Sequence, residues 1–429
     1  TFSFDLFCSS SKLLKTFSGH TSYVNSIDYS IFNDCQYICS GSRDNTVRVW
    51  DVKTAKQIKE FNGHSHFVYC AKFSPYHYYY CGLNHLRPTV CSSSQDKTIR
   101  FWDFETSKEF QVLNGHTGWV SGITFSPFNN GRYLCSTSSD KTVRLWDVET
   151  YKALHIFNGH KGAVWCVDFS PLLNYNSNKS NSTGVIGGNG YTFCSGSYDN
   201  TICLWDIETA KECSVFKGHE HVVGSVKYSP YETNILCSGS GDRSIRLWDL
   251  RSKKEIQIFR GHTNEIWAVE YAPFVLTKDS SCGKILCSGA RDNTIRFWDI
   301  RINKQMHAIK GIEGDNGILA IQFLSLEKKD KSVDGNDYCV NLYYEYKTLN
   351  SFVQNTTKIV GVNVSSPLII EKVTKMYWKK CKTPSFIEIN EIIETFNEII
   401  LAIHEGRKKK KFLRINEITV EHVNGDSDL

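Results

Sequence analysis

A histidine, a serine and an aspartate recur in the same order six times along this chain. The first set is His20, Ser40 and Asp44, and Trp50 follows it. In a serine hydrolase these three residue types supply the general base, the nucleophile and the carboxylate that orients the base. One active site needs only one such set, so six copies argue against catalysis. Each of these polar groups needs a hydrogen-bond partner when it is buried, which favours a structural role.

The recurring residues belong to a longer repeat that opens with Gly-His and closes with Trp-Asp. The openings are Gly19-His20, Gly63-His64, Gly115-His116, Gly159-His160, Gly218-His219 and Gly261-His262. The closings are Trp50-Asp51, Trp102-Asp103, Trp146-Asp147, Trp205-Asp206, Trp248-Asp249 and Trp298-Asp299. The shortest unit, from Gly218 to Gly261, is about 43 residues long. This length falls within the range of ~40–45 residues that is typical of a four-stranded propeller blade.

The first unit has the polarity pattern of four short β-strands. Residues 23–29 alternate in apolar character, residues 36–42 and 46–50 flank a tight turn, and residues 57–61 come last. Asp44 and Asn45 suit the turn because their side chains hydrogen-bond the local backbone. A single sheet of this kind cannot bury both faces, whereas sheets stacked around an axis bury them against each other.

On these residues the chain resembles the WD40-repeat β-propeller family over roughly Lys12 to Ile300. Most units carry a nearly complete Cys-Ser-Gly-Ser-x-Asp-x-Thr-Ile-Arg-x-Trp-Asp pattern, which is similar to that of G-protein β-like propellers. The resemblance implies an all-β propeller in which each blade holds one hydrogen-bonded tetrad. The implied tetrads are His20, Ser40, Asp44 and Trp50; His64, Ser92, Asp96 and Trp102; His116, Ser136, Asp140 and Trp146; His160, Ser195, Asp199 and Trp205; His219, Ser238, Asp242 and Trp248; and His262, Ser288, Asp292 and Trp298.

Six clear units fit either six blades or seven blades of which one is degenerate, and we expect seven. Residues 317–323 align with the first strand of the other units, and residues 338–344 can supply a second strand. Residues 351–353 can supply a third. A competing register pairs Asp337 with the turn aspartate and Tyr343 with the tryptophan, and the sequence does not choose between them.

The outer strand of the last blade is predicted to come from the N-terminus. Residues 12–17 match residues 56–61 position for position, directly before the first Gly-His pair. The family resemblance implies that such a strand exchange closes the ring, and closure removes exposed sheet edges. We therefore expect the propeller to span residues 1–355.

The chain has sixteen cysteines, a net charge of +5 and no long apolar segment or signal-peptide pattern. Six of the cysteines occupy one repeated position, immediately before the tetrad serine: Cys39, Cys91, Cys135, Cys194, Cys237 and Cys287. Equivalent positions lie one per blade, so disulfides are disfavoured, and no zinc motif is present. We expect no metal, no cofactor and a reducing location in the cytoplasm or nucleus. Direct nucleic-acid binding is disfavoured because no basic stripe or RNA-recognition motif occurs.

One face of the predicted propeller carries long inserts, and the opposite face carries short turns. The inserts, residues 76–90, 172–191 and 274–284, all lie between the first and second strands of their units. In the family, partners contact the short-turn face through residues beside the first-strand valine and before the turn aspartate. The candidate protein-binding residues are Tyr23, Arg43, Phe67, Tyr69, Trp119, Trp165, Tyr198, Glu265, Trp267 and Arg291. Aromatic residues and arginine dominate interface hot spots, although these rings could instead pack between blades.

Beyond residue 355 the repeat vanishes, so residues 356–429 are expected to form a C-terminal extension. A Ser-x-x-Glu capping box at Ser385 and isoleucines at helical spacing predict an amphipathic helix over about 385–406. A basic run follows at residues 407–411. The helix could pack on the propeller or be offered to a partner.

The sequence favours a non-enzymatic scaffold that assembles proteins into complexes. One alternative rests on Arg251 and Arg301, because Trp-Asp-x-Arg in two consecutive units resembles the box of substrate receptors for cullin–RING ubiquitin ligases. In that family the arginine contacts the ligase adaptor. A second alternative is a reader of a modified peptide, in which aromatic rings at the channel would cage a modified Lys or Arg. An enzyme is disfavoured because no unrepeated nucleophile–base set stands out.

Overall fold

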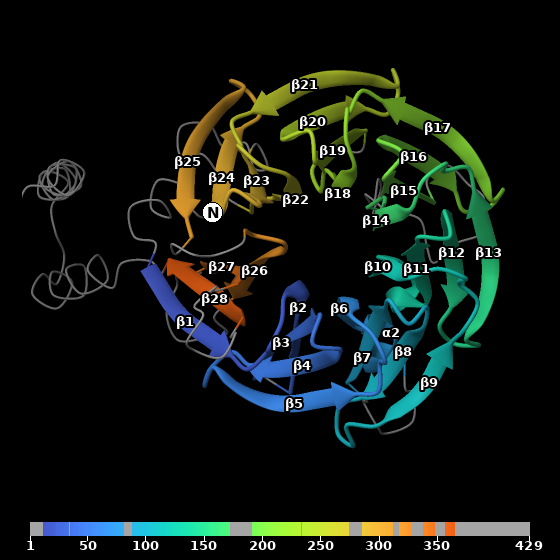
Figure 1. The fold of residues 1–429 in the computed structure, drawn as a ribbon, viewed down its shortest axis with the longest axis vertical. Coiled ribbons are helices and arrows are strands. Elements are labelled where there is room, and N and C mark those ends of the chain that lie inside the picture. Colours follow the sequence, from blue (N-terminus) through green and yellow to red (C-terminus); the bar gives the residue numbers. More distant parts are fainter. Residues whose placement is uncertain are drawn as a thin grey trace, which may run out of the picture. The chain divides into compact units, whose positions relative to one another are not determined.

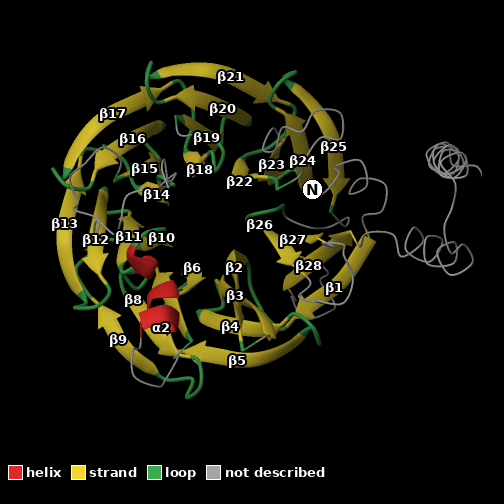
Figure 2. Ribbon diagram, turned by 180° about the vertical axis from the view of Figure 1, so that it is seen from behind, coloured by secondary structure: helices red, strands yellow, loops and turns green. Residues whose placement is uncertain are grey.

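The strands of this chain form a ring of four-stranded antiparallel sheets (Figure 1). The computed structural model describes residues 12–33, 35–80, 88–171, 191–232, 234–273, 285–311, 317–327, 338–347 and 357–364. The chain divides into two compact units, Thr1–Ser366 and Pro367–Leu429, and the described residues all lie in the first. In the part of the chain that the structure describes, helix is limited to α2 (Pro75–Tyr80) and the 3₁₀ turn η1 (Asn129–Gly131), as Figure 2 shows.

Six blades follow one another along the chain, each from its innermost to its outermost strand. Blade 1 consists of β2 (Val24–Phe32), β3 (Cys35–Ser42), β4 (Thr46–Asp51) and β5 (Lys56–Asn62). Blade 2 consists of β6 (Val68–Phe73), β7 (Thr89–Ser94), β8 (Ile99–Asp103) and β9 (Glu109–Leu113). Blade 3 consists of β10 (Val120–Phe125), β11 (Tyr133–Ser138), β12 (Thr142–Asp147) and β13 (Lys152–Asn158). Blade 4 consists of β14 (Val164–Phe169), β15 (Thr192–Ser197), β16 (Thr201–Asp206) and β17 (Lys211–Lys217). Blade 5 consists of β18 (Val223–Tyr228), β19 (Ile235–Ser240), β20 (Ser244–Asp249) and β21 (Lys254–Arg260). Blade 6 consists of β22 (Ile266–Tyr271), β23 (Ile285–Ala290), β24 (Thr294–Asp299) and β25 (Lys304–Lys310).

The turn between the second and third strands has the same backbone in all six blades. The residue after the turn aspartate has a positive φ each time, for example 69° at Asn45 and 67° at Asn200. Asparagine tolerates this left-handed conformation better than most residues, and it occupies three of the six positions, while Lys97, Lys141 and Arg243 occupy the others. The short turn holds the aspartate close to the end of the sheet where the first strand begins.

A further four-stranded sheet combines strands from both ends of the described chain, in the order β1, β28, β27, β26. We call it the bipartite sheet. Its strands are β1 (Lys12–Ser18), β26 (Ile321–Glu327), β27 (Tyr338–Lys347) and β28 (Thr357–Val364). β1 is the outermost strand and pairs with β28, Thr16 lying opposite Val360.

The position expected for residues 351–353 is held in this sheet by β28, which lies past residue 355. Residues 351–353 themselves fall outside the described ranges. The β28 sequence is rich in Val and Ile, which favour strands, but it lacks the Trp-Asp ending that marks the other third strands. The predicted helix over 385–406, the basic run at 407–411 and most insert residues also lie outside the described ranges.

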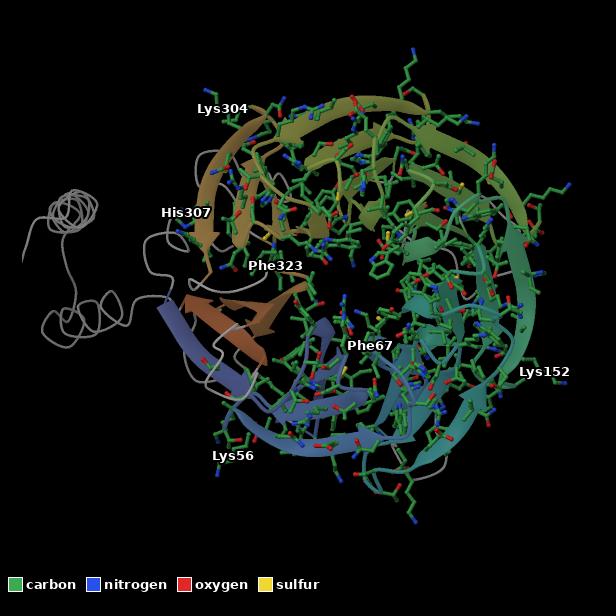
Figure 3. All side chains as sticks on the ribbon, viewed as in Figure 1. Lys56, Phe67, Lys152, Lys304, His307 and Phe323 are labelled. Carbon is green, nitrogen blue, oxygen red and sulfur yellow. The ribbon has the colours of Figure 1, made fainter. Side chains whose placement is uncertain are left out.

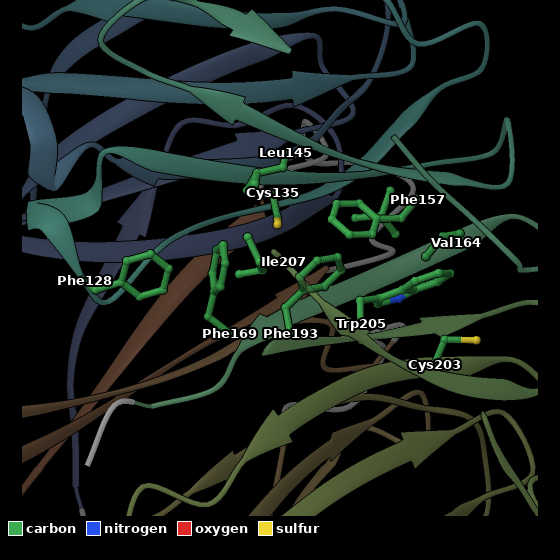
Figure 4. Close-up of a cluster of buried hydrophobic side chains, with 11 residues drawn as sticks. Phe128, Cys135, Leu145, Phe157, Val164, Phe169, Phe193, Cys203, Trp205 and Ile207 are labelled. Carbon is green, nitrogen blue, oxygen red and sulfur yellow. The ribbon is translucent and has the colours of Figure 1, made fainter. Parts of the chain in front are cut away.

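The hydrophobic core lies between neighbouring blades. In the cluster drawn in Figure 4, Leu145 and Phe157 from blade 3 pack with Phe193 and Trp205 from blade 4. Phe157 and Phe193 meet edge to face, with ring centroids 4.8 Å apart. Because each sheet buries its faces against the next one, no blade has a complete core of its own.

The innermost strands carry a sheet edge that faces the channel, and side chains of the preceding blade bond to it. Ser26 Oγ accepts the Ala71 N–H at 2.8 Å, and Asp28 Oδ2 accepts the Phe73 N–H at 2.9 Å. The same relation joins Asp168 to Tyr228 and Ser225 to Val269. These bonds satisfy backbone groups that would otherwise be left as an open edge, and they fix each blade against its neighbour.

Candidate functional site

In each of the six blades the His, Ser, Asp and Trp lie within hydrogen-bond distance of one another. In blade 1, Trp50 Nε1 donates to Ser40 Oγ at 2.8 Å, and Ser40 Oγ lies 2.8 Å from His20 Nε2. His20 Nδ1 lies 2.7 Å from Asp44 Oδ2. The remaining blades repeat these contacts at 2.7–2.9 Å.

The direction of the hydrogen bonds fixes the protonation of the histidine. The ionised aspartate can only accept, so Nδ1 of the neutral imidazole carries the proton, and the serine, which accepts from the indole N–H, donates its own hydroxyl proton to Nε2. Nε2 is then the unprotonated nitrogen of the ring, and it accepts from the serine. All six tetrad serines have no exposed surface. A substrate cannot reach such a hydroxyl, and the hydrogen bonds of each tetrad join the strands and the turn of one blade.

Four tetrad histidines and all six tetrad aspartates have pKa values below their ordinary ones. Desolvation lowers the pKa of His20, His64, His116 and His262 below the ordinary 6.5, although the aspartate opposes this. Burial alone would raise the pKa of Asp44. Hydrogen bonds from His20, the Thr46 hydroxyl and the Thr21 N–H outweigh it and hold that pKa well below its usual range. Hydrogen bonds lower the pKa values of the other five tetrad aspartates in the same way.

Acid is therefore expected to destabilise the propeller through these tetrads. Below the ordinary histidine pKa of 6.5, His20, His64, His116 and His262 take up protons in the unfolded chain more readily than in the folded one, so stability is lost as pH falls. Below about pH 4 the aspartates add a second loss of the same sign. Urea unfolding between pH 8 and pH 5 checks this, with a level free energy of unfolding above pH 7 and a decline below 6.5. A free energy that rises from pH 7 to pH 5 would contradict it.

Most of the candidate protein-binding residues gather at one end of the channel, which we call the mouth. There the starts of four innermost strands and the turn after β15 bring five rings together: Tyr69, Trp119, Trp165 and Trp267 from the strand starts, and Tyr198 from the turn. We call these five the aromatic arc. Its centroid distances run from 5.2 Å, between Trp165 and Trp267, to 6.5 Å, between Trp119 and Tyr198. Tyr198 is 44% exposed, while Tyr69 and the three tryptophans are half-buried. The arc therefore combines contact between rings with exposure to solvent.

Two arginines lie at the mouth beside the aromatic arc. Arg43 lies over the ring of Tyr23, 4.9 Å from its centroid, and near Phe67, which is 39% exposed. Figure 3 shows Phe67 pointing toward the centre of the ring, whereas Lys56, Lys152 and Lys304 extend outward from the rim. Arg291 lies over Trp267 and forms an ion pair with Glu265 at 3.0 Å.

A cavity of about 350 Å³ lies in the channel beneath these residues. Its lining includes Tyr69, Trp165, Tyr198 and Trp267, together with Arg43, Glu265, Arg291, His221 and Leu319. Its size is at the small end of the range for ligand pockets, so it has room for a few side chains. Burial raises the pKa of Tyr69 and Tyr198, and the positive charge of Arg43 acts against that rise in both.

Charged side chains on the innermost strands pair across the blades. Lys72 Nζ lies 3.1 Å from Asp28 Oδ1, and Lys227 Nζ lies 3.4 Å from Glu270 and 3.7 Å from Asp168. Glu270 and Asp168 raise the pKa of Lys227. We did not single out these residues from the sequence. The available signal was that acidic and basic residues share one repeated position on the first strand.

The structure separates Arg251 and Arg301 from the mouth. Both lie two residues past the end of a third strand, and antiparallel pairing places that turn at the opposite end of the sheet. Arg251 is exposed, and its backbone N–H donates to Asp249 Oδ1 at 2.9 Å. The Arg301 guanidinium bonds to both oxygens of Asp299, at 3.2 and 2.9 Å.

Within the described ranges, no group of three or more His, Cys, Asp or Glu side chains is arranged to hold a metal. No helix in the same ranges has the length and apolar character needed to span a membrane.

Comparison with known proteins supports the geometry of the blades. A family model described as "WD domain, G-beta repeat" matches residues 11–51, 55–103, 107–147, 151–206, 210–249 and 253–299. Nuclear distribution protein nudF of Aspergillus niger is 31% identical over 132 residues, covering 28% of this chain and 29% of that protein. The ribosome biogenesis protein WDR12 homolog of Nematostella vectensis is 35% identical over 120 residues, covering 27% of this chain and 25% of that protein. Nuclear distribution protein PAC1 of Arthroderma benhamiae is 32% identical over 124 residues. Each of these alignments spans less than a third of the relative's length. Because the family model covers more than half of the sequence, the chain belongs to the WD40 family of β-propeller proteins.

Proposed function

We propose that this propeller is a non-enzymatic scaffold that binds protein partners at the mouth of its channel. The aromatic arc is the observation that carries the proposal. Its rings come from blades 2, 3, 4 and 6, so one partner segment contacts several blades at once. Aromatic and arginine side chains are the types that contribute most to protein–protein affinity. Their attachment to strands of a rigid ring limits the entropy lost on binding.

The test is affinity purification of the full-length protein followed by mass spectrometry, beside the double variant Trp165→Ala and Trp267→Ala. Proteins recovered with the wild type and lost with the variant are the partners of the mouth. Recovery of the same proteins at the same level with both forms would overturn the proposal. We place the protein in the cytoplasm or nucleus, since the described cysteines are free thiols, most of them buried.

A second proposal concerns the opposite face, where Arg251 is exposed in a Trp-Asp-x-Arg box. An exposed guanidinium beside Asp249 is available to an adaptor of a cullin–RING ligase. Because the Arg301 guanidinium is held by Asp299, Arg251 is expected to contribute more than Arg301 to binding of the adaptor. Co-purification with the adaptor should fall with Arg251→Ala and fall little further when Arg301→Ala is added. If no adaptor co-purifies with the wild type, this second function is excluded.

We also propose that the bipartite sheet is a seventh blade and that β1 closes the ring. Phe17 on β1 supports this, since it is fully buried and meets Trp50 of blade 1 edge to face at 6.1 Å. On this account the propeller extends to residue 364 and the C-terminal extension follows it.

Phe17→Ala is expected to lower the free energy of unfolding by about 3 kcal/mol, because it leaves a cavity beside Trp50. Urea unfolding measures the loss. Ile58→Ala on the exposed outer strand β5 is the control, since Ile58 is 39% exposed. If both variants unfold like the wild type, β1 does not close the ring.

A further inference from the structure

The charges of the described side chains at the mouth do not cancel. Glu265 accepts from Arg291 at 3.0 Å and from Trp267 Nε1 at 3.2 Å, so Arg291 has a carboxylate partner. Arg43 forms no ion pair with any carboxylate in the described part of the chain. Its Nε donates instead to Asn25 Oδ1 at 3.1 Å. Two described guanidinium groups and one described carboxylate thus lie at the rim of the cavity, and among these described side chains one positive charge has no carboxylate partner.

Neighbouring polar and aromatic groups also hold the Arg43 side chain in place without neutralising its charge. Asn25 Nδ2 donates to the Val68 carbonyl at 2.8 Å, which turns Asn25 Oδ1 toward Arg43. The rings of Tyr23 and Phe67 support the guanidinium at 4.9 and 5.9 Å. A guanidinium fixed in this way offers its remaining N–H groups to an anion with little further loss of entropy.

The same contacts weigh against a cationic occupant. Tyr23, Phe67 and Trp267 each already have an arginine guanidinium above or near the ring. A methylated lysine would have to compete with these arginines for the rings and would meet a site with excess positive charge. An acidic side chain meets a complementary charge instead, and a neighbouring apolar side chain can contact the aromatic arc.

We propose that the mouth binds a peptide segment in which an acidic side chain lies next to an aromatic or aliphatic one, with the acidic group on Arg43 and the apolar group on the aromatic arc. This inference rests on the proposed function, because it specifies the partner of the same site. The acidic group is an aspartate, a glutamate or a phosphorylated serine or threonine. These share the ability to accept two hydrogen bonds from one guanidinium.

The test uses an array of short synthetic peptides, which is probed with the full-length protein. Each peptide contains a fixed tryptophan, and every flanking position is varied, with phosphoserine among the residues tried. Enrichment of Glu, Asp or phosphoserine beside the tryptophan supports the proposal, and the stronger of the two groups identifies carboxylate or phosphate as the natural anion. Enrichment of lysine or methyl-lysine, or no enrichment of acidic residues, overturns it. The best acidic peptide is then labelled, and its affinity is measured by fluorescence anisotropy.

Three variants give the affinity a predicted order. Arg43→Gln is expected to weaken binding of the acidic peptide at least about tenfold, since a charge-assisted hydrogen bond is lost. Glu265→Gln is expected to strengthen binding of the same peptide several-fold, because Arg291 then loses its carboxylate partner and becomes available to the acidic group of the peptide. Arg243→Gln is the matched control and should leave the affinity unchanged. It removes one exposed arginine from the same face, but Arg243 does not line the cavity.

The outcomes separate this inference from the proposed function. If Trp165→Ala with Trp267→Ala abolishes partner binding but Arg43→Gln does not, the mouth is the binding site and the acidic occupant is wrong. If Glu265→Gln weakens binding of the acidic peptide, the Glu265 carboxylate does not compete with the acidic group for Arg291 and the inference is wrong. If neither the tryptophan nor the arginine substitutions change partner binding, both proposals fail.

Discussion

Trp205→Ala is expected to lower the free energy of unfolding by about 3–5 kcal/mol, near the upper end of that range. Trp205 is 1% exposed and lies in the cluster between blades 3 and 4. Its ring packs against Phe157 at 5.7 Å and Phe193 at 6.2 Å. Removing it leaves a cavity shared by two blades, and Ser195 also loses the indole N–H that donates to it.

Trp205→Phe separates the two contributions to that loss. Phenylalanine keeps most of the packing but cannot donate to Ser195, so the loss should fall to about 1–3 kcal/mol. Ile156→Ala on the outer strand β13 is the control, because Ile156 is 45% exposed and should change stability by about 0.5 kcal/mol or less. Urea unfolding followed by circular dichroism gives all three values. A Trp205→Ala protein as stable as the wild type would show that neither the tetrad of blade 4 nor the cluster between blades 3 and 4 stabilises the fold.

The double variant Trp165→Ala and Trp267→Ala is expected to abolish detectable partner binding while leaving the fold intact. Truncating a hot-spot residue costs about 2 kcal/mol or more, so two such losses weaken binding by roughly a thousandfold. Both tryptophans are half-buried, and their rings contact each other at 5.2 Å. They lie outside the tetrads, so the propeller retains its core.

Phe110→Ala with Leu154→Ala is the matched control for that experiment. These side chains are 44% and 40% exposed on the outer strands β9 and β13, away from the mouth. The control variant should bind the partner as the wild type does. If the control loses the partner and the tryptophan variant keeps it, the binding surface is the rim of the propeller.

The repeat made the architecture of the blades predictable from sequence. Gly-His and Trp-Asp mark the same two points of every unit, and the polarity pattern between them fixes which strands are inner and outer. The all-β propeller and its family were predicted from these residues, and the family is confirmed by the match to residues 11–299 in six segments. The spacing from Ser195 to Asp199 and Trp205 recurs in each unit because one turn places all three side chains on one sheet.

What the sequence did not predict depends on contacts between blades. The alignment of Arg43 by Asn25 requires knowing that Asn25 bonds to Val68 of the next blade. The pairing of Lys227 with Glu270 also crosses blades. The third strand of the bipartite sheet was missed because β28 lacks the turn aspartate and the tryptophan, so only its Val and Ile content signalled a strand.

Hydrogen–deuterium exchange of the full-length protein, alone and with a partner recovered by affinity purification, tests most directly whether the mouth is the binding site. We predict slower exchange in the complex over residues 67–70, 118–121, 163–166 and 265–268, and in the turns at Arg43 and Tyr198. Unchanged exchange there, with protection confined to the turns at Arg251 and Arg301, would contradict this assignment and place the partner on the opposite face.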